Sequence, residues 1–155
     1  MNNLPDRVIE FLREQSFVIV STIDKNGLVH NSCKGLVNIN NTGQVYLLDL
    51  YKSRTFENLN RNPSLSITSV DEHRFIGYCL KGKGKIVENA ALNPEIIADW
   101  EARITSRLSK RLIKNIRGEK GSRGHPEAVL PKPEYMIVMA VEEIVDLSPH
   151  KAPQI

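Results

Sequence analysis

The chain has 155 residues, a mass of 17.5 kDa and a net charge of +3, with 41% hydrophobic and 25% charged residues. These values are ordinary for one soluble domain with a single core. No apolar run approaches the ~18 residues that cross a bilayer, and the N-terminus lacks the pattern of a secretory signal, so we expect a cytoplasmic protein. The only cysteines, Cys33 and Cys79, are far apart and have no histidine pair nearby. We therefore expect no metal site or disulfide framework, and we interpret both thiols as small buried hydrophobes.

The N-terminal third of the chain predicts a helix followed by strands. Residues 4–15 carry apolar side chains at helical spacing with charged residues opposite, which is typical of an amphipathic helix. Runs rich in β-branched and apolar residues then predict three strands, at 17–23, 28–40 and 44–50. Turn sequences between them, DKNG and NNTG, favour hairpins because asparagine and glycine tolerate positive φ angles.

The remaining elements are a short helix, two strands, a long helix and a last strand. The short helix spans about 53–61, and Asn62-Pro63 ends it. The strands are predicted at 64–70, 75–88 and 135–147. From about residue 93, apolar residues recur every four positions, which predicts a helix with one buried stripe. Residues 118–133 form a long Gly- and Pro-rich loop, of a kind that is usually functional or mobile.

Short hairpin connections favour an antiparallel sheet, and six strands with apolar inner faces favour closure into a barrel. We predict one domain, 1–155, that is mainly β with helices. It is a six-stranded, mostly antiparallel split barrel with an N-terminal helix, a short helix after the third strand and a long helix before the last.

The charge is unevenly distributed. Residues 103–123 contain eight Lys or Arg and one Glu, a balance of 8 − 1 = +7, so the remainder carries 3 − 7 = −4. Such a segment attracts anions, and nucleic acid is one candidate. A solvated helix face explains the same pattern. Only Trp100 flanks the run, whereas modules that bind single-stranded nucleic acid usually interleave several aromatic residues.

The most informative stretch is 47–67, where a strand ends and the short helix begins. Ser53 stands at the expected helix cap, and Lys52, Arg54 and Thr55 surround the first turn. Helix N-termini present unpaired N–H groups and a partial positive charge, which suits a phosphate. Arg54 can add a two-pronged contact. The alternative is a helix that merely begins with serine among basic neighbours.

This stretch resembles the pyridoxamine 5′-phosphate oxidase-like, FMN-binding split-barrel family. The resemblance is carried by a strand, Ser-Arg-Thr at 53–55, Asn58-Leu59, Asn62-Pro63 and a following strand. It extends over nearly all of 4–88 and includes the last strand. It implies a homodimer that binds two FMN molecules in the crevices between subunits.

The resemblance also implies roles for individual residues. Arg54 and Thr55 would grip the FMN phosphate, with Lys52 and Ser53 adjoining and Asn58 one turn further along the helix. The second strand would contribute residues beside the ring and ribityl chain, and the third strand would place Leu48 and Asp49 close to the flavin. The second-strand residues are Asn31, Ser32, Cys33 and Lys34. A reduced flavin needs hydrogen-bond donors near N1, and the second-strand residues can supply them. The alternative is that Asn31 and Ser32 simply face solvent on an alternating strand. An acid at Asp49 is unusual so near a phosphate dianion.

The remaining candidates are aromatic residues and histidines. We interpret Trp100 chiefly as a packing anchor of the long helix, with stacking on a partner's flavin as the alternative. His125 is the best histidine for a substrate contact, and Tyr51 and Tyr78 are candidates to line the cleft. We identify no catalytic residue.

The family's genuine pyridoxamine phosphate oxidases carry an Arg-x-His element near their end. This chain ends VEEIVDLSPHKAPQI instead, so we do not expect vitamin B6 oxidation. The sequence favours an FMN-dependent oxidoreductase or electron carrier of unassigned substrate. The alternatives are the same fold with a deazaflavin or haem, and a nucleic-acid-binding module that uses 103–123.

Overall fold

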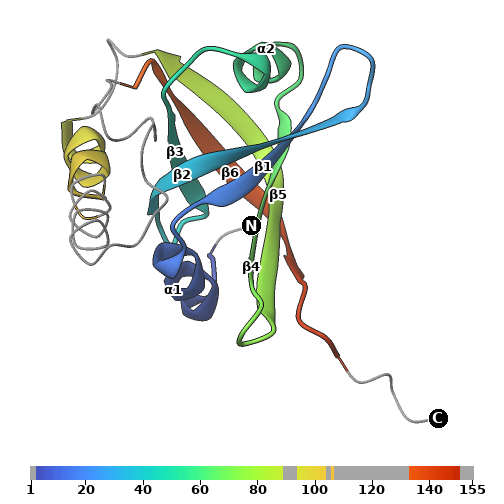
Figure 1. The fold of residues 1–155 in the computed structure, drawn as a ribbon, viewed down its shortest axis with the longest axis vertical. Helices are drawn as coiled ribbons and strands as arrows, with labels where there is room; N and C mark the ends of the chain where they lie inside the picture. The colour runs from blue at the N-terminus through green and yellow to red at the C-terminus, as the bar shows by residue number, and fades with distance from the viewer. Residues whose placement is uncertain (1–2, 89–93, 104–105, 107–132, 151–155) are drawn as a thin grey trace, which may run out of the picture.

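The computed structural model describes residues 3–88, 94–103, 106 and 133–150 (Figure 1). It contains two labelled helices and six strands. They are, in chain order, α1 (Asp6–Glu14), β1 (Val18–Ile23), β2 (Val29–Ile39), β3 (Gln44–Asp49), α2 (Arg54–Arg61), β4 (Ser64–Asp71), β5 (Ile76–Glu88) and β6 (Tyr135–Asp146). Residues 94–103 are also helical. Residues 104–105 and 107–117 of the predicted long helix, residues 118–132 of the predicted loop and His125 lie outside the described residues.

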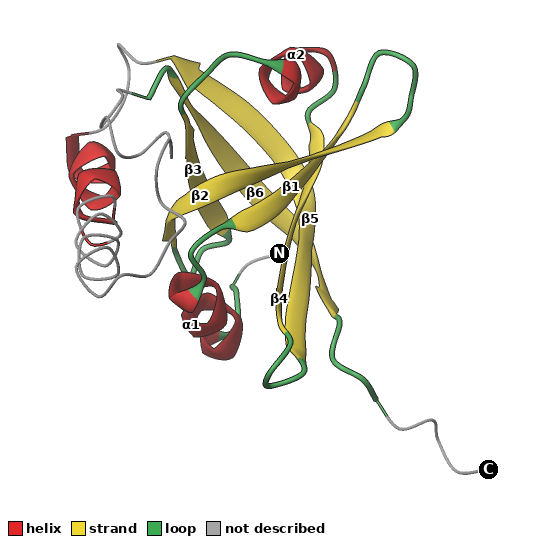
Figure 2. Ribbon diagram, in the orientation of Figure 1, coloured by secondary structure: helices red, strands yellow, loops and turns green. Residues whose placement is uncertain are grey.

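The six strands form one closed antiparallel barrel in the order β1-β2-β3-β6-β5-β4 (Figure 2). Pairing of β1 with β4 closes it, with Val20 opposite Ile67. Both side chains point inward and are fully buried, as the two-residue period of strands requires. The predicted six-stranded antiparallel barrel, its N-terminal helix and its short helix after the third strand are confirmed.

The two labelled helices cover different ends of the barrel (Figure 1). In α1, the apolar side chains Val8, Phe11 and Leu12 are buried in the core, which is why this amphipathic segment packs there. In α2, Leu59 enters the same core from the other end. The Asn62 amide donates to the carbonyl of Asn58 as the helix ends, just before Pro63.

A third helical segment, 94–103, packs against the outside of β3 and β6. Ile96 forms a small buried cluster with Leu48 and Met136, and Trp100 packs against that cluster. The interpretation of Trp100 as a packing anchor is confirmed. No helix among the described residues is both long and apolar enough to span a membrane.

Two smaller expectations are wrong. Cys33 is exposed and Cys79 is half-buried, so Cys33 is not a buried hydrophobe. Cys33 lies at an outward position of β2, opposite Ile19 of β1, which is 40% exposed. Tyr78 does not line a cleft, because it is 7% exposed and packs edge-on against Phe11 in the core, with ring centroids 5.3 Å apart.

Candidate functional site

The connection between β3 and α2 leads directly into the helix start that the sequence singles out. Ser53 occupies the N-cap position, but its side chain makes no capping hydrogen bond. Its carbonyl accepts the first helical bond, from the amide of Glu57 at 3.1 Å. The amides of the preceding turn have no intrahelical acceptor, as at every helix start. Ser53 is exposed, so its hydroxyl is accessible from solvent.

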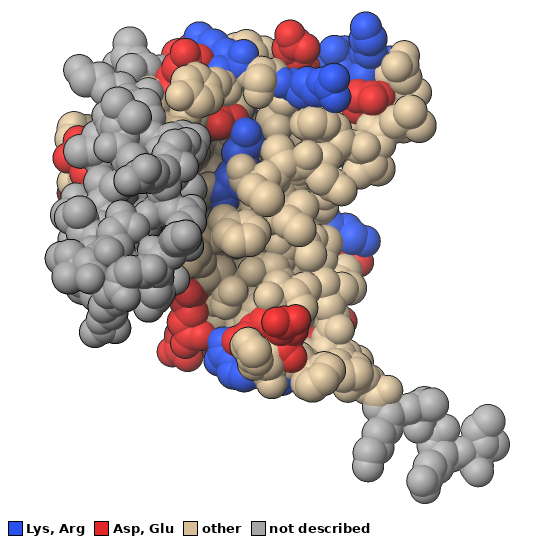
Figure 3. Space-filling view, in the orientation of Figure 1, with Lys and Arg blue, Asp and Glu red and all other residues tan. Residues whose placement is uncertain are grey.

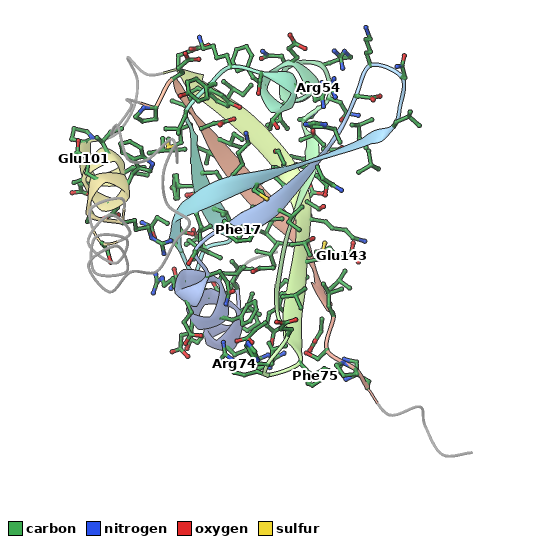
Figure 4. The ribbon with its side chains drawn as sticks, in the orientation of Figure 1. Phe17, Arg54, Arg74, Phe75, Glu101 and Glu143 are labelled. Atoms are coloured by element: carbon green, nitrogen blue, oxygen red, sulfur yellow. The ribbon has the colours of Figure 1, made fainter. Side chains whose placement is uncertain are left out.

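Arg54 is the first residue of α2 and is exposed. Its guanidinium has no hydrogen-bond or ion-pair partner among the residues that the structure describes. Figure 4 shows it at the α2 end of the barrel, away from Arg74 and Phe75. Lys and Arg side chains gather at this end, with Asp and Glu among them (Figure 3). The cation at the helix start is therefore accessible and uncommitted.

Lys52, by contrast, is held by two acids. Its ammonium lies 2.7 Å from the Glu88 carboxylate, and both side chains are partly exposed. Its backbone amide donates to Glu134 Oε2 at 2.7 Å. The ammonium also lies 5.2 Å from the centre of the Phe56 ring. The acids at this end of the barrel thus compete with any anion for Lys52.

Thr55 and Asn58 face inward and attach α2 to the barrel. Thr55 is 1% exposed, and its hydroxyl lies 2.9 Å from that of Ser32 on β2. The Asn58 side-chain amide donates to the Thr22 hydroxyl of β1 at 3.0 Å, and both groups are buried. Both predicted ligand residues lie in the expected helix, but the Thr55 hydroxyl and the Asn58 side-chain nitrogen already have partners in the protein.

The four predicted residues of β2 lie on two faces of the strand. Ser32 pairs with the buried Val20, and Lys34 likewise pairs with a buried valine, so both point inward. Asn31 and Cys33 alternate with them and are exposed. Asn31 Oδ1 accepts a hydrogen bond from Ser21 at 2.6 Å. One ligand therefore cannot meet all four side chains from a single face of this barrel.

Lys34 and Asp49 form a buried ion pair, with the ammonium 2.7 Å from Oδ2 and side-chain exposures of 11% and 9%. The same carboxylate oxygen accepts a hydrogen bond from the fully buried Tyr135 at 2.5 Å. Burial first, and then the bond to Asp49, raise the pKa of Tyr135 well above its usual value. Lys34 balances the charge of Asp49, so this acid does not oppose a nearby phosphate as its position in the sequence suggested.

Sequence reasoning missed Tyr135 and Glu134. Tyr135 lies opposite Asp49 in the β3–β6 pairing, and the pairing of strands distant in sequence cannot be read from the local pattern. Tyr51, the remaining aromatic candidate, is 57% exposed in the β3–α2 connection. Elsewhere, a polar hollow of about 320 Å³ beside α1 contains none of the predicted site residues.

The closed six-stranded antiparallel barrel, with a helix before it and a short helix after β3, has the split-barrel architecture. Residues 4–144 match the family model described as pyridoxamine 5′-phosphate oxidase. The chain therefore belongs to this family. The comparison with curated proteins gave no match.

Solved structures show the same fold. HupZ of Group A Streptococcus is 19% identical, with 94% of each chain covered and a TM-score of 0.62. HutZ of Vibrio cholerae, described as a haem storage protein, is 18% identical over 92% of this chain and 94% of that one, with a TM-score of 0.52. A protein described as F420 reductase is 12% identical over 88% and 94%, with a TM-score of 0.53. At these identities the likeness concerns the fold alone.

Proposed function

We propose that this chain binds FMN non-covalently, with the phosphate at the start of α2, and acts as an FMN-dependent oxidoreductase or electron carrier of unassigned substrate. One observation carries the proposal. The start of α2 combines the exposed guanidinium of Arg54, which has no partner within the described part of the chain, with the hydroxyl of Ser53, which makes no capping bond, and the first-turn amides, which have no intrahelical acceptor. A phosphate dianion is the ligand that satisfies all of these donors together.

The charges around this point fit the cofactor. Arg54 carries a free positive charge, and Lys52 adjoins it. Glu88 and Glu134 oppose a phosphate, but Glu88 is exposed and paired, so its field is strongly screened by solvent. Asp49 is neutralised by Lys34. We assign the phosphate to Arg54, Ser53 and the α2 amides, with Thr55 and Asn58 supporting the helix rather than binding the ligand.

Bound FMN would supply hydride or single-electron transfer. The protein's part is to hold and orient it. Asn31 and Cys33 lie on the exposed outer face of β2, and the proposal is that the ring extends from the α2 site along this face. Ser32 and Lys34 lie on the inner face, beneath α2 and the end of β3. Asn31 is thus the polar side chain of this group best placed for the ring.

We further propose a homodimer with the cofactor between the subunits. Exposed apolar side chains next to the outer face of β1 and β2 support it: Phe17 is 56%, Ile19 40% and Val29 66% exposed. Phe17 lies just before β1 (Figure 4). Exposed apolar side chains that share one face, here interrupted by the polar pair Ser21–Asn31, are common at interfaces, and a flat aromatic ring buried there would lose its contact with water.

Titration of the purified protein with FMN, deazaflavin cofactor F420 and haemin, each followed by absorption, tests the proposal. We expect saturable FMN binding at one molecule per chain, with the flavin bands resolved as the ring leaves water. The proposal is contradicted if FMN does not bind. Saturable binding of F420 or haemin in the same assay would then assign that ligand to the chain instead. Sedimentation velocity of the loaded protein tests the homodimer.

A further inference from the structure

The start of β6 is fastened to both ends of the β3–α2 connection. The amide of Glu134 donates to the carbonyl of Asp49 at 3.0 Å. Its carboxylate accepts from the amide of Lys52 at 2.7 Å. The next residue, Tyr135, donates its hydroxyl proton to the Asp49 carboxylate at 2.5 Å. Glu134, just before β6, and Tyr135, its first residue, lie more than 80 positions later in the chain and bond to Asp49 and Lys52, two residues that flank the turn.

Tyr135 also contacts the helix that follows the connection. Its ring packs edge-on against Phe56, with centroids 5.0 Å apart at 67°. Phe56 lies in the first turn of α2, two residues after Arg54. One fully buried side chain thus contacts the residue before the connection and the helix turn after it, which sets the distance and angle between them.

Beyond these bonds and the partly exposed contacts of Lys52 with Glu88 and Phe56, the connection has few constraints. Tyr51, Lys52 and Ser53 are all exposed, so their side chains bury little surface that would fix the backbone. A free connection would lose conformational entropy when it closed on a ligand, and that loss would reduce affinity. A connection held in place before binding avoids it.

On the basis of the proposed function, we infer that Tyr135 is a positioning residue for the phosphate. It touches no ligand, and acts through Asp49 and Phe56 to hold Ser53, Arg54 and the α2 amides in the binding arrangement. Burial of its hydroxyl and the bond to Asp49 keep the phenol protonated, so the donated hydrogen bond is permanent at neutral pH.

The inference predicts a selective loss. Tyr135→Phe removes only the hydroxyl, so it should loosen the connection that holds the phosphate and leave the ring environment unchanged. FMN and riboflavin share the ring and differ in the phosphate. We expect the dissociation constant for FMN to rise about 5- to 10-fold, less than the tenfold or more that loss of a direct charge-assisted bond to the phosphate implies, because Tyr135 acts through Asp49 and Phe56. The constant for riboflavin should change less than about twofold.

Both constants are measured on the full chain by quenching of flavin fluorescence, with melting temperature recorded in parallel. Tyr78→Phe is the matched control, because Tyr78 is equally a buried tyrosine but packs on Phe11 of α1. Tyr78→Phe should leave the ratio of the FMN dissociation constant to the riboflavin dissociation constant unchanged. Phe56→Leu is the second variant, because it removes the ring contact from the other side, and it should likewise raise the dissociation constant for FMN relative to that for riboflavin.

The outcomes separate this inference from the proposed function. If the wild-type protein binds FMN and riboflavin equally, the phosphate site itself is wrong. If the wild type prefers FMN and both Tyr135→Phe and Phe56→Leu keep that preference in full, Tyr135 does not position the phosphate. Equal weakening of both ligands with a lower melting temperature would assign Tyr135 a purely structural role and would likewise overturn the inference.

Discussion

The hydroxyls of Ser32 and Thr55 lie 2.9 Å apart and join the first turn of α2 to strand β2. Thr55 is 1% exposed, whereas its neighbour Arg54 is exposed. Arg54 and Thr55 are adjacent, and the chemistry of both suits a phosphate, but their structural roles therefore differ. Thr55 fixes the helix to the barrel, and Arg54 presents a free cation outside it.

This relationship predicts a stability effect for Thr55. Thr55→Val should lower the free energy of unfolding by about 1–2 kcal/mol, because it leaves the partly buried Ser32 hydroxyl without its partner. Ser32→Ala should do the same, and the double variant should cost less than the sum. Urea unfolding of the four proteins checks this. Thr68→Val, on the outer side of β4, is the control, and strict additivity would show that the two hydroxyls do not interact.

The buried ion pair predicts a larger effect. Lys34→Met leaves the Asp49 carboxylate buried without its cation, which should cost about 3–5 kcal/mol. Lys34→Met combined with Asp49→Asn should be more stable than Lys34→Met alone, because the amide is neutral and still offers Tyr135 an acceptor. Chemical denaturation measures both. A double variant that is less stable than Lys34→Met would contradict this account of the pair.

Glu88 competes with the proposed phosphate for Lys52. Glu88→Gln should strengthen FMN binding by about two- to fivefold at low salt, since exposed ion pairs are worth roughly 0.2–1 kcal/mol. The gain should fade as salt screens the charges. Glu143→Gln is the control, because Glu143 pairs with Lys81 at 3.5 Å on the side of the barrel (Figure 4). The interpretation fails if the two variants bind FMN alike.

The contacts of Asp71 in the hairpin between β4 and β5 predict that the stability of the protein depends on pH. The Arg74 side chain, and then its amide, lower the pKa of Asp71. A carboxylate with a depressed folded pKa adds stability above its unfolded pKa of about 3.9, and this is lost as pH falls through the folded value. Asp71→Asn should therefore lower the melting temperature at pH 7 and have little effect near pH 2.

The matched control for Asp71→Asn is Glu72→Gln, which changes the adjacent exposed acid. It should leave the melting temperature nearly unchanged at pH 7. Differential scanning calorimetry at the two pH values makes the comparison. An Asp71→Asn effect that is the same at pH 7 and pH 2 would show that the hydrogen bonds of Asp71 do not depend on its charge.

Most of the fold could be predicted because its signals are local. Hairpin turns, alternating strands and the Asn62-Pro63 stop each act within a few residues, and they place every labelled element within about two residues of its observed bounds. Closure of the barrel followed from the number of strands. What could not be predicted is which strands distant in sequence lie side by side.

The site was predicted only in part for the same reason. The start of α2 is a local signal, so the sequence correctly placed Ser53 and Arg54 at this helix start. The direction of each side chain depends on the register of β2 with its neighbours, which separates Asn31 from Ser32. Tyr135 entered the site only through the pairing of β3 with β6. Residue type identified the chemistry, and the tertiary structure decided which residues are free to perform it.

The central claim is that a phosphate binds where α2 begins. The two arginines at the ends of α2 provide the most direct comparison, because Arg54 begins the helix and Arg61 ends it, and both are exposed. Arg54→Ala should raise the dissociation constant for FMN about 10- to 100-fold, as loss of a charged hydrogen-bond donor implies. Arg61→Ala should leave it within about twofold of wild type. Equal FMN affinities for the two variants would contradict the account.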